Sequence, residues 1–264
     1  GAGLLSNTYE DGKGILRFDG SVTKLGESAF YNKDNITSVL LPDSVTEIEN
    51  QAFFSCNAIT EVALPATLRK IGTSAFSYCG SMSEMYLPES ITEIGTNAFF
   101  ACTGTLFVDC NIGEYACYKS DFHEVHIGEN VDSIGYAAFL NNSSLKEIHI
   151  PDNVAFIEAY SFSRCTALEK VTIGKGIRLI AYYAFDGCSQ LDEIIISSLM
   201  PPQANESFLG DIRSDKTIYV PGGLGASYSS MPFWRDYASM IVEDESLGTA
   251  EDNIYVSTDY SSDG

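Results

Sequence analysis

Seven cysteines and three histidines are the side chains of this 264-residue chain that could bind a metal or form disulfides. The number of cysteines is odd, and the sequence contains no Cys-x-x-Cys pair. Five of them keep a spacing of 23 residues in two groups: Cys56, Cys79 and Cys102, then Cys165 and Cys188. This spacing is a structural repeat and not a metal-ligand spacing, so we expect free thiols stacked inside the fold. Disulfides and a metal site are the alternatives, above all at Cys110 and Cys117, which fall outside the period.

Two of the histidines show the same spacing. His126 and His149 are 23 residues apart, and Glu124 and Glu147 stand two residues before them. In an extended strand, residues i and i+2 lie on one face, so a repeat fold would gather two imidazoles and two carboxylates. The arrangement has three interpretations: a solvated sheet face, a contact surface for a partner, or a divalent-metal site.

Catalytic motifs are weak in this sequence. Two Ser–Lys pairs have the S-x-x-K spacing, Ser21 with Lys24 and Ser143 with Lys146, but they occupy unrelated positions of the 23-residue period. No G-x-S-x-G, H-E-x-x-H or P-loop motif occurs. We therefore predict no enzyme activity and no cofactor, and the enzymatic alternative is a hydrolase with an unrecognised site.

The composition indicates a folded, strongly acidic protein. Asp and Glu number 36 and Lys and Arg 15, which gives a formal net charge of −21, and 45% of the residues are apolar. Nucleic-acid binding needs clustered Lys and Arg, so the charge argues against it and favours basic or cation-bridged partners. No apolar run is long enough for a membrane-spanning helix, and the given sequence shows no secretory signal. We expect a monomer.

Phenylalanine reveals the internal repeat. It recurs every 23 residues in two runs: Phe30, Phe53, Phe76 and Phe99, then Phe139, Phe162, Phe185 and Phe208. Between the runs lies one degenerate copy, because Ile112 to Cys117 reads IGEYAC where Ile71 to Phe76 reads IGTSAF. Cys117 thus takes the place of the phenylalanine.

Each unit reads approximately V-T-x-I-G-x-x-A-F-x-x-C-x-x-L-x-E-V-x-L-P-x-S. The alternation in E-V-x-L predicts a short strand with one face buried, and the following proline predicts a turn. V-T-x-I-G predicts a second short strand, and A-F-x-x-C a tight turn or one turn of 3₁₀ helix. Such a unit buries its apolar positions only by stacking on its neighbours, so we predict a mainly β solenoid with short parallel strands in two ladders.

Ten rungs of the first ladder are predicted: Leu16–Phe18, Val39–Leu41, Val62–Leu64, Met85–Leu87, Leu106–Val108, Val125–Ile127, Ile148–Ile150, Val171–Ile173, Ile194–Ile196 and Ile218–Val220. At ~4.8 Å between neighbouring strands, they would form a sheet about 43 Å long.

The sequence divides into four parts. Residues 1–14 form a lead-in, 15–199 the repeat solenoid, 200–243 the last rung with a C-terminal cap, and 244–264 an acidic tail. Aromatic residues in the cap predict one or two short helices between Leu224 and Met240. After Val242 the chain has seven Asp or Glu and no Lys or Arg, so we expect the tail to be mobile.

The outward-facing positions of the first ladder form two columns. One column is Arg17, Leu40, Ala63, Tyr86, Phe107, His126, His149, Thr172, Ile195 and Tyr219. The other stands two residues earlier and is Ile15, Ser38, Glu61, Glu84, Thr105, Glu124, Glu147, Lys170, Glu193 and Thr217. Ring side chains with charges around them are typical of protein interfaces. We therefore predict a partner-binding surface, called here the aromatic patch: Tyr86, Phe107, His126 and His149, flanked by Glu84, Glu124 and Glu147.

The string L-P-x-S-V-T-x-I-G-x-x-A-F-x-x-C at a period of 23 resembles the BspA-type (treponemal-type) leucine-rich repeats of bacterial surface proteins. The resemblance covers about residues 15 to 243 and includes the end-piece, where MPPQANESF is followed by IYVP and an aromatic segment. It implies a leucine-rich-repeat solenoid, a secreted or surface location, and no common enzyme activity. Several members are linked to adhesion to host proteins. Residues 99–139, which are shortened, depart from the pattern.

These observations and the resemblance together predict a non-enzymatic secreted or cell-surface adhesion protein. It would present a rigid acidic face to a macromolecular partner, which would be a host or matrix protein or a glycan. The alternative is a carbohydrate-binding or scaffold module of a nutrient-capture system.

Overall fold

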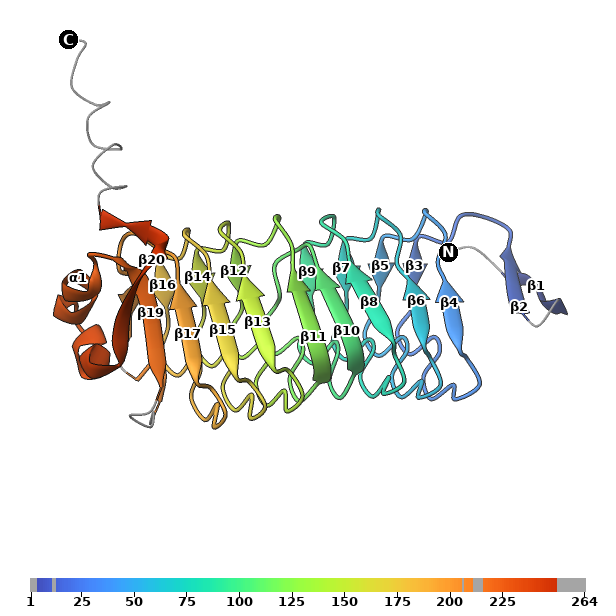
Figure 1. Ribbon diagram of the computed structural model, residues 1–264. Helices are drawn as coiled ribbons and strands as arrows, with labels where there is room; N and C mark the ends of the chain where they lie inside the picture. Colours follow the sequence, from blue (N-terminus) through green and yellow to red (C-terminus); the bar gives the residue numbers. More distant parts are fainter. Residues whose placement is uncertain (1–3, 11–12, 206, 211–215, 251–264) are drawn as a thin grey trace, which may run out of the picture.

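The protein is an elongated solenoid (Figure 1). The computed structural model describes residues 4–10, 13–205, 207–210 and 216–250. Each regular coil contributes one strand to a long sheet and one shorter strand to a second ladder, which lies behind the first in Figure 1. The predicted solenoid with two strand ladders is confirmed.

The long sheet has ten parallel strands. Their order is β20-β19-β17-β15-β13-β11-β10-β8-β6-β4. Their bounds are β4 (Ser38–Leu40), β6 (Glu61–Ala63), β8 (Glu84–Leu87), β10 (Thr103–Val108), β11 (Asp121–Ile127), β13 (Glu147–Ile150), β15 (Lys170–Ile173), β17 (Glu193–Ile196), β19 (Thr217–Gly222) and β20 (Ile241–Thr249). Equivalent residues of successive copies are paired, as in Leu106 with Met85 and Ile148 with Val171. The apolar positions therefore all enter one core, and the alternate positions all face outward.

The second ladder consists of two-residue strands in two separate sheets. The first sheet contains β3 (Lys24–Leu25), β5 (Glu47–Ile48), β7 (Lys70–Ile71) and β9 (Glu93–Ile94). The second contains β12 (Ser133–Ile134), β14 (Phe156–Ile157), β16 (Leu179–Ile180) and β18 (Gln203–Ala204). The ladder breaks at the shortened copy, where a single bridge pairs Ile112 with Ile134.

The repeated phenylalanines form the centre of the core. The rings of Phe139 and Phe162 are 5.3 Å apart and those of Phe162 and Phe185 5.4 Å, each pair within 5° of parallel. Phe30, Phe53, Phe76 and Phe99 stack in the same way in the first run. The turn that carries each ring has i→i+3 hydrogen bonds, such as Cys165 N to Phe162 O at 3.2 Å. These bonds are of the predicted 3₁₀ type.

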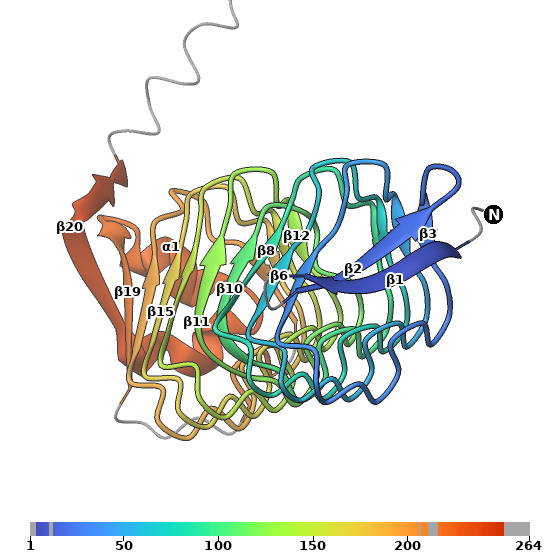
Figure 2. The ribbon, with the colours of Figure 1, turned by 90° about the vertical axis from the view of Figure 1, so that its right-hand side faces the viewer.

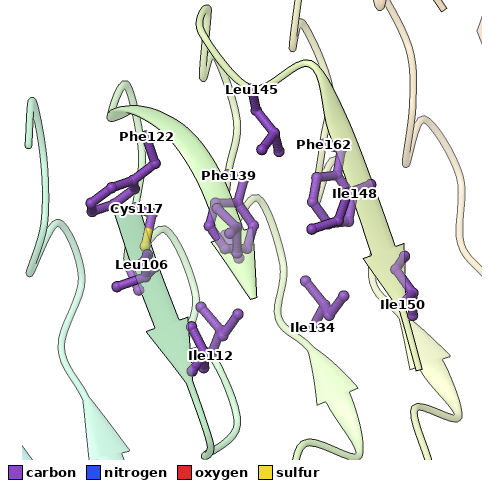
Figure 3. Close-up of a cluster of buried hydrophobic side chains, with 14 of the residues drawn as sticks. Leu106, Ile112, Cys117, Phe122, Ile134, Phe139, Leu145, Ile148, Ile150 and Phe162 are labelled. Carbon is purple, nitrogen blue, oxygen red and sulfur yellow. The ribbon is translucent and has the colours of Figure 1, made fainter. Parts of the chain in front are cut away.

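The shortened copy keeps the core continuous by a different route. Phe99 N donates to Ala116 O at 2.8 Å, which is the bond that Phe76 N makes to Ala98 O. Cys117 therefore does occupy the phenylalanine position, and it has no ring. Figure 3 shows Phe122, from the start of β11, beside Cys117 on the coil next to Phe139. Phe122 is fully buried, so it supplies the aromatic volume that Cys117 lacks.

The cysteines form the predicted ladder of free thiols. All seven are free and buried. In the five regular copies, the thiol donates to the carbonyl of the phenylalanine one coil earlier, as in Cys79 Sγ to Phe53 O at 3.2 Å and Cys165 Sγ to Phe139 O at 3.3 Å. Burial raises the pKa of Cys79 and of Cys110 to about 12. Both groups are therefore thiols at neutral pH, and a thiol reacts slowly because the thiolate is the nucleophile.

Thiol titration tests this ladder. In the native protein at pH 8, we expect an aromatic disulfide reagent to modify few cysteines, because raised pKa values and burial suppress the thiolate. After denaturation without reductant, six or seven groups should react. Recovery of only one to three would mean that the cysteines are paired in disulfides.

The N-terminal end differs from the sequence prediction. The segment expected to form the first rung, Leu16–Phe18, lies in β2 (Lys13–Phe18), which pairs antiparallel with β1 (Leu4–Glu10). This hairpin lies at the end of the solenoid, outside the ten-stranded sheet (Figures 1 and 2). The first-rung prediction was therefore wrong. An alternating strand can pair on either side, and β1 lies only a few residues away in sequence.

The C-terminal end supplies the tenth strand instead. β20 pairs with β19, so residues 244–249 of the expected tail belong to the sheet, and that boundary was wrong. Residues 251–264 lie outside the described residues. The predicted cap helices are present as α1 (Gly225–Ser230) and the 3₁₀ helix η1 (Trp234–Met240).

The cap covers the last coil with buried aromatic side chains. Trp234 is fully buried, and its Nε1 donates to Pro202 O at 2.8 Å. The Phe208 ring packs on Trp234 at 4.8 Å and on Tyr237 at 5.0 Å. The hydrogen-bond register shifts by one residue here. Phe162 N donates to Ala184 O, the carbonyl just before the next phenylalanine, whereas Phe185 N donates to the carbonyl of Phe208 itself. The last ring therefore packs on the cap.

Candidate functional site

The aromatic patch lies on the outward face of the ten-stranded sheet. The strand register pairs Tyr86 with Phe107, Phe107 with His126, and His126 with His149. Four successive strands, β8, β10, β11 and β13, thus bring together the four side chains that the 23-residue spacing predicted.

Among the described residues, no helix is long and apolar enough to cross a membrane.

Three of these side chains form a continuous ring stack. The Tyr86 and Phe107 rings are 4.2 Å apart and 1° from parallel, and the Phe107 and His126 rings are 4.5 Å apart and 6° from parallel. Tyr86 is 54% exposed, and His126 is also exposed. Parallel in-register strands hold equivalent side chains one strand spacing apart, so the rings face each other along the sheet and present a flat apolar edge to solvent.

A shallow hollow of about 380 Å³ adjoins the ring stack. Tyr86, Phe107 and His126 line one part of it. The remainder comes from the strand ends and the turns that follow them, among them Leu64, Pro88, Val108, Asp109 and Ile127. The sequence analysis did not select these residues, although the repeated L-P pair at the end of each strand marks their position. The hollow provides a place into which a partner side chain could insert.

The acidic column runs beside the rings. Glu61 is paired in register with Glu84, and like charges directly opposite each other destabilise a sheet. Further along, Glu147 lies opposite Lys170, which in turn binds Glu193 at 3.0 Å. Among the described strands, Glu61 and Glu84 have Ser38 and Thr105 as their other neighbours in the register, whereas the other end of the column is partly neutralised by Lys170.

Glu124 contacts an imidazole of the patch. Its Oε1 lies 3.0 Å from His126 Nε2, and both side chains are about half exposed, at 56% and 49%. This contact orients the His126 ring within the stack. Among the residues that the structure describes, no group of three or more His, Cys, Asp or Glu side chains is close enough to hold a metal ion. Glu124 and His126 therefore form a surface contact between a carboxylate and an imidazole.

Comparison with known proteins agrees with this architecture. A family model described as "BspA type Leucine rich repeat region (6 copies)" matches residues 15–107 and 110–224. No curated protein matches the chain.

Several solved structures are similar to the chain. A Leucine Rich Repeat protein of T. pallidum is 19% identical, covering 91% of this chain and 95% of the other, with a TM-score of 0.45. A leucine rich cell surface protein of Faecalibacterium prausnitzii A2-165 is 18% identical, covering 67% and 77%, with a TM-score of 0.31. A leucine-rich repeat protein of Bacteroides ovatus ATCC 8483 is 20% identical, covering 81% and 66%, with a TM-score of 0.35.

Proposed function

Because the chain belongs to the BspA-type leucine-rich repeat family, we propose that it is a non-enzymatic adhesion protein of the bacterial surface or exterior. Its aromatic patch would dock a protein partner on the ten-stranded sheet. Repeat solenoids present extended rigid surfaces of this kind to their partners. The observation that carries the proposal is the in-register stack of exposed Tyr86, half-buried Phe107 and exposed His126 beside an open hollow. Antibody labelling of intact source cells tests the location.

The stack has the properties of an interface centre. Aromatic side chains contribute much of the binding energy in protein interfaces, mainly where a partner encloses them in a dry pocket. Rings held face to face have little conformational freedom left to lose on binding, which lowers the entropic cost of association. The hollow beside them would receive an apolar partner side chain, while the glutamates would remain at the rim.

The charges favour a basic or cation-bridged partner. The net charge is −21, and Glu61 and Glu84 repel each other beside the rings. A Lys or Arg side chain placed between these carboxylates would relieve that repulsion. Charges of this kind mainly speed association and set salt dependence, so binding should weaken as the salt concentration rises.

The test is binding to a panel of purified extracellular-matrix proteins. For a matrix protein that binds, the double variant Tyr86→Ala with Phe107→Ala should raise Kd at least tenfold, or about 1.4 kcal/mol. Surface plasmon resonance at two salt concentrations measures the affinity and its salt dependence. Because both side chains are on the outward face, the double variant should melt close to the wild type.

Tyr31→Ala is the matched control, because Tyr31 is a 45% exposed tyrosine outside the ten-stranded sheet. It should bind like the wild type. If the double variant binds normally, the aromatic patch is a solvated sheet face and not the docking surface. A panel without any binder, together with binding to a glycan array, would favour the carbohydrate-binding alternative over protein adhesion.

A further inference from the structure

A second hollow opens where the last regular coil meets the C-terminal cap. Its volume is about 400 Å³, and it is lined by Tyr182, Tyr183, Asn205 and Phe233. Tyr182 and Tyr183 follow β16, Asn205 follows β18, and Phe233 precedes η1. Three separate parts of the chain therefore converge on it, away from the ten-stranded sheet that carries the aromatic patch.

The walls of this hollow are mainly aromatic. The rings of Tyr182 and Tyr183 are 5.9 Å apart and perpendicular within 2°, at 88°, so they form a corner, and Phe233 adds a third ring. Tyr182, Tyr183 and Phe233 are 42%, 37% and 38% exposed. Asn205 contributes a carboxamide, which can both donate and accept hydrogen bonds. The polar groups of the described lining residues are the Asn205 carboxamide and two tyrosine hydroxyls, which are suited to hydrogen bonding with an uncharged ligand.

Phe233 is held in an unusual conformation. Its φ is 66° and its ψ is −26°, and a bulky residue at positive φ carries backbone strain. The neighbouring Trp234 side chain is fully buried against Phe208, which fixes the backbone beside it. The cap thus holds an exposed aromatic ring rigidly at the rim of the hollow.

A row of tyrosines leads away from the hollow along the solenoid. The Tyr183 and Tyr160 rings are 5.3 Å apart, those of Tyr160 and Tyr136 5.7 Å, and those of Tyr136 and Tyr115 5.4 Å. We call Tyr115, Tyr136, Tyr160 and Tyr183 the tyrosine ridge. Each member lies two or three residues before the phenylalanine position of its copy, so the ridge has one aromatic side chain per coil.

From this geometry we propose that the hollow and the tyrosine ridge bind a linear neutral glycan lying along the solenoid axis. A sugar ring has apolar C–H faces, which pack on aromatic rings, and hydroxyl edges, which pair with a carboxamide. The corner of Tyr182 and Tyr183, with Phe233 and Asn205, offers both kinds of contact to one terminal sugar. Following sugars would lie over the ridge, because a pyranose unit is about as long as one coil is high, ~4.8 Å.

The charge of the protein selects among glycans. With a net charge of −21, the protein repels anionic polysaccharides over long distances. A neutral polysaccharide is not repelled. A proline-rich peptide also stacks on aromatic grooves, but it has no hydroxyl pairs for the Asn205 carboxamide. This site is independent of the aromatic patch, so the two proposals can fail separately.

Affinity electrophoresis tests the proposal in gels that contain starch, laminarin, xylan, galactomannan or hydroxyethyl cellulose. We expect at least one of these neutral polysaccharides to retard the protein. Tyr183→Ala and Phe233→Ala should each weaken that retardation at least tenfold in apparent Kd. Tyr31→Ala, and the double variant Tyr86→Ala with Phe107→Ala, should leave it unchanged.

Two measurements guard against a folding artefact. Asn205→Ala removes only an exposed amide, so it should weaken retardation with an unchanged melting temperature. Emission from Trp234, the single tryptophan and the neighbour of Phe233, should change on titration with an oligosaccharide of the retarding polymer. The proposal is overturned if no polysaccharide retards the protein, if the Tyr183 and Phe233 variants are retarded like the wild type, or if poly-L-proline binds and no polysaccharide does.

Discussion

Phe162→Ala should lower the melting temperature by roughly 6–20 °C or split the transition in two. Phe162 is fully buried between the Phe139 and Phe185 rings. Removing a buried phenylalanine costs about 3–5 kcal/mol, and each kcal/mol shifts the melting temperature by about 2–4 °C in a chain of this size. In a solenoid the loss falls on two neighbouring interfaces at once, so the coils on either side can uncouple. Thermal melting followed by circular dichroism measures both outcomes.

Phe156→Ala is the matched control for this variant. Phe156 belongs to the same copy of the repeat, in β14, but it is 39% exposed. The same truncation there should cost less than about 1 kcal/mol, since much of the side chain already contacts water. Equal melting of the two variants would contradict the ring stack as the centre of the core.

Gly104→Ala should destabilise the shortened copy by at least about 1–3 kcal/mol. Gly104 has a φ of +97°, where a side chain carries strain of that size. A Cβ there would also meet Met82 O and lie 2.5 Å from Ser83 O, so β10 and the chain just before β8 would have to move apart. The ladder register shifts at this point, between Gly104 and Thr105. Chemical denaturation measures the change.

Gly80→Ala provides the comparison one coil earlier. A Cβ at Gly80 would find only Ala101 O, at 3.9 Å, an ordinary contact. Its effect should lie within about 0.5 kcal/mol, as for most surface substitutions. If Gly104→Ala is as mild as Gly80→Ala, the close approach of β10 to the preceding coil is not required for the fold.

The repeat period predicted most of the architecture because one spacing determines several features together. Once Phe139, Phe162 and Phe185 are aligned, the thiols, the strand positions and the outward columns follow at constant offsets. The pairing of His126 with His149 was therefore visible from the sequence alone. The register of the rings in the aromatic patch followed from the same reasoning, whereas the docking role that we propose for them rests on their exposure and on the charges beside them.

The ends and the shortened copy were harder to predict, because their partners are not set by the period. The segment Ile15 to Phe18 alternates like a rung, and its choice of β1 over β4 depends on packing at the end of the solenoid. β20 carries Glu243, Asp244 and Glu245, so it does not resemble a buried strand. Charges on an edge strand prevent further strand addition, which is why the terminal strand has a tail-like composition.

The second hollow was missed for a related reason. The tyrosines of the ridge were visible in the sequence, two or three residues before the phenylalanine positions. Phe233 and Asn205, however, reach the hollow only through the fold of the cap, where the period no longer holds. The sequence therefore predicted surfaces built within the repeat and not the surface between the repeat and the cap.

Hydroxyl-radical footprinting of the complex with a bound matrix protein tests the central claim most directly. Radicals oxidise exposed aromatic side chains, and the chain contains its own references, because Tyr86, Tyr31, Tyr78 and Tyr182 are 54%, 45%, 44% and 42% exposed. We predict that the partner protects Tyr86, Phe107 and His126 from oxidation and leaves the other three tyrosines at their free rates. Unchanged oxidation of Tyr86 and Phe107, with protection elsewhere, would contradict the assignment of the aromatic patch as the docking surface.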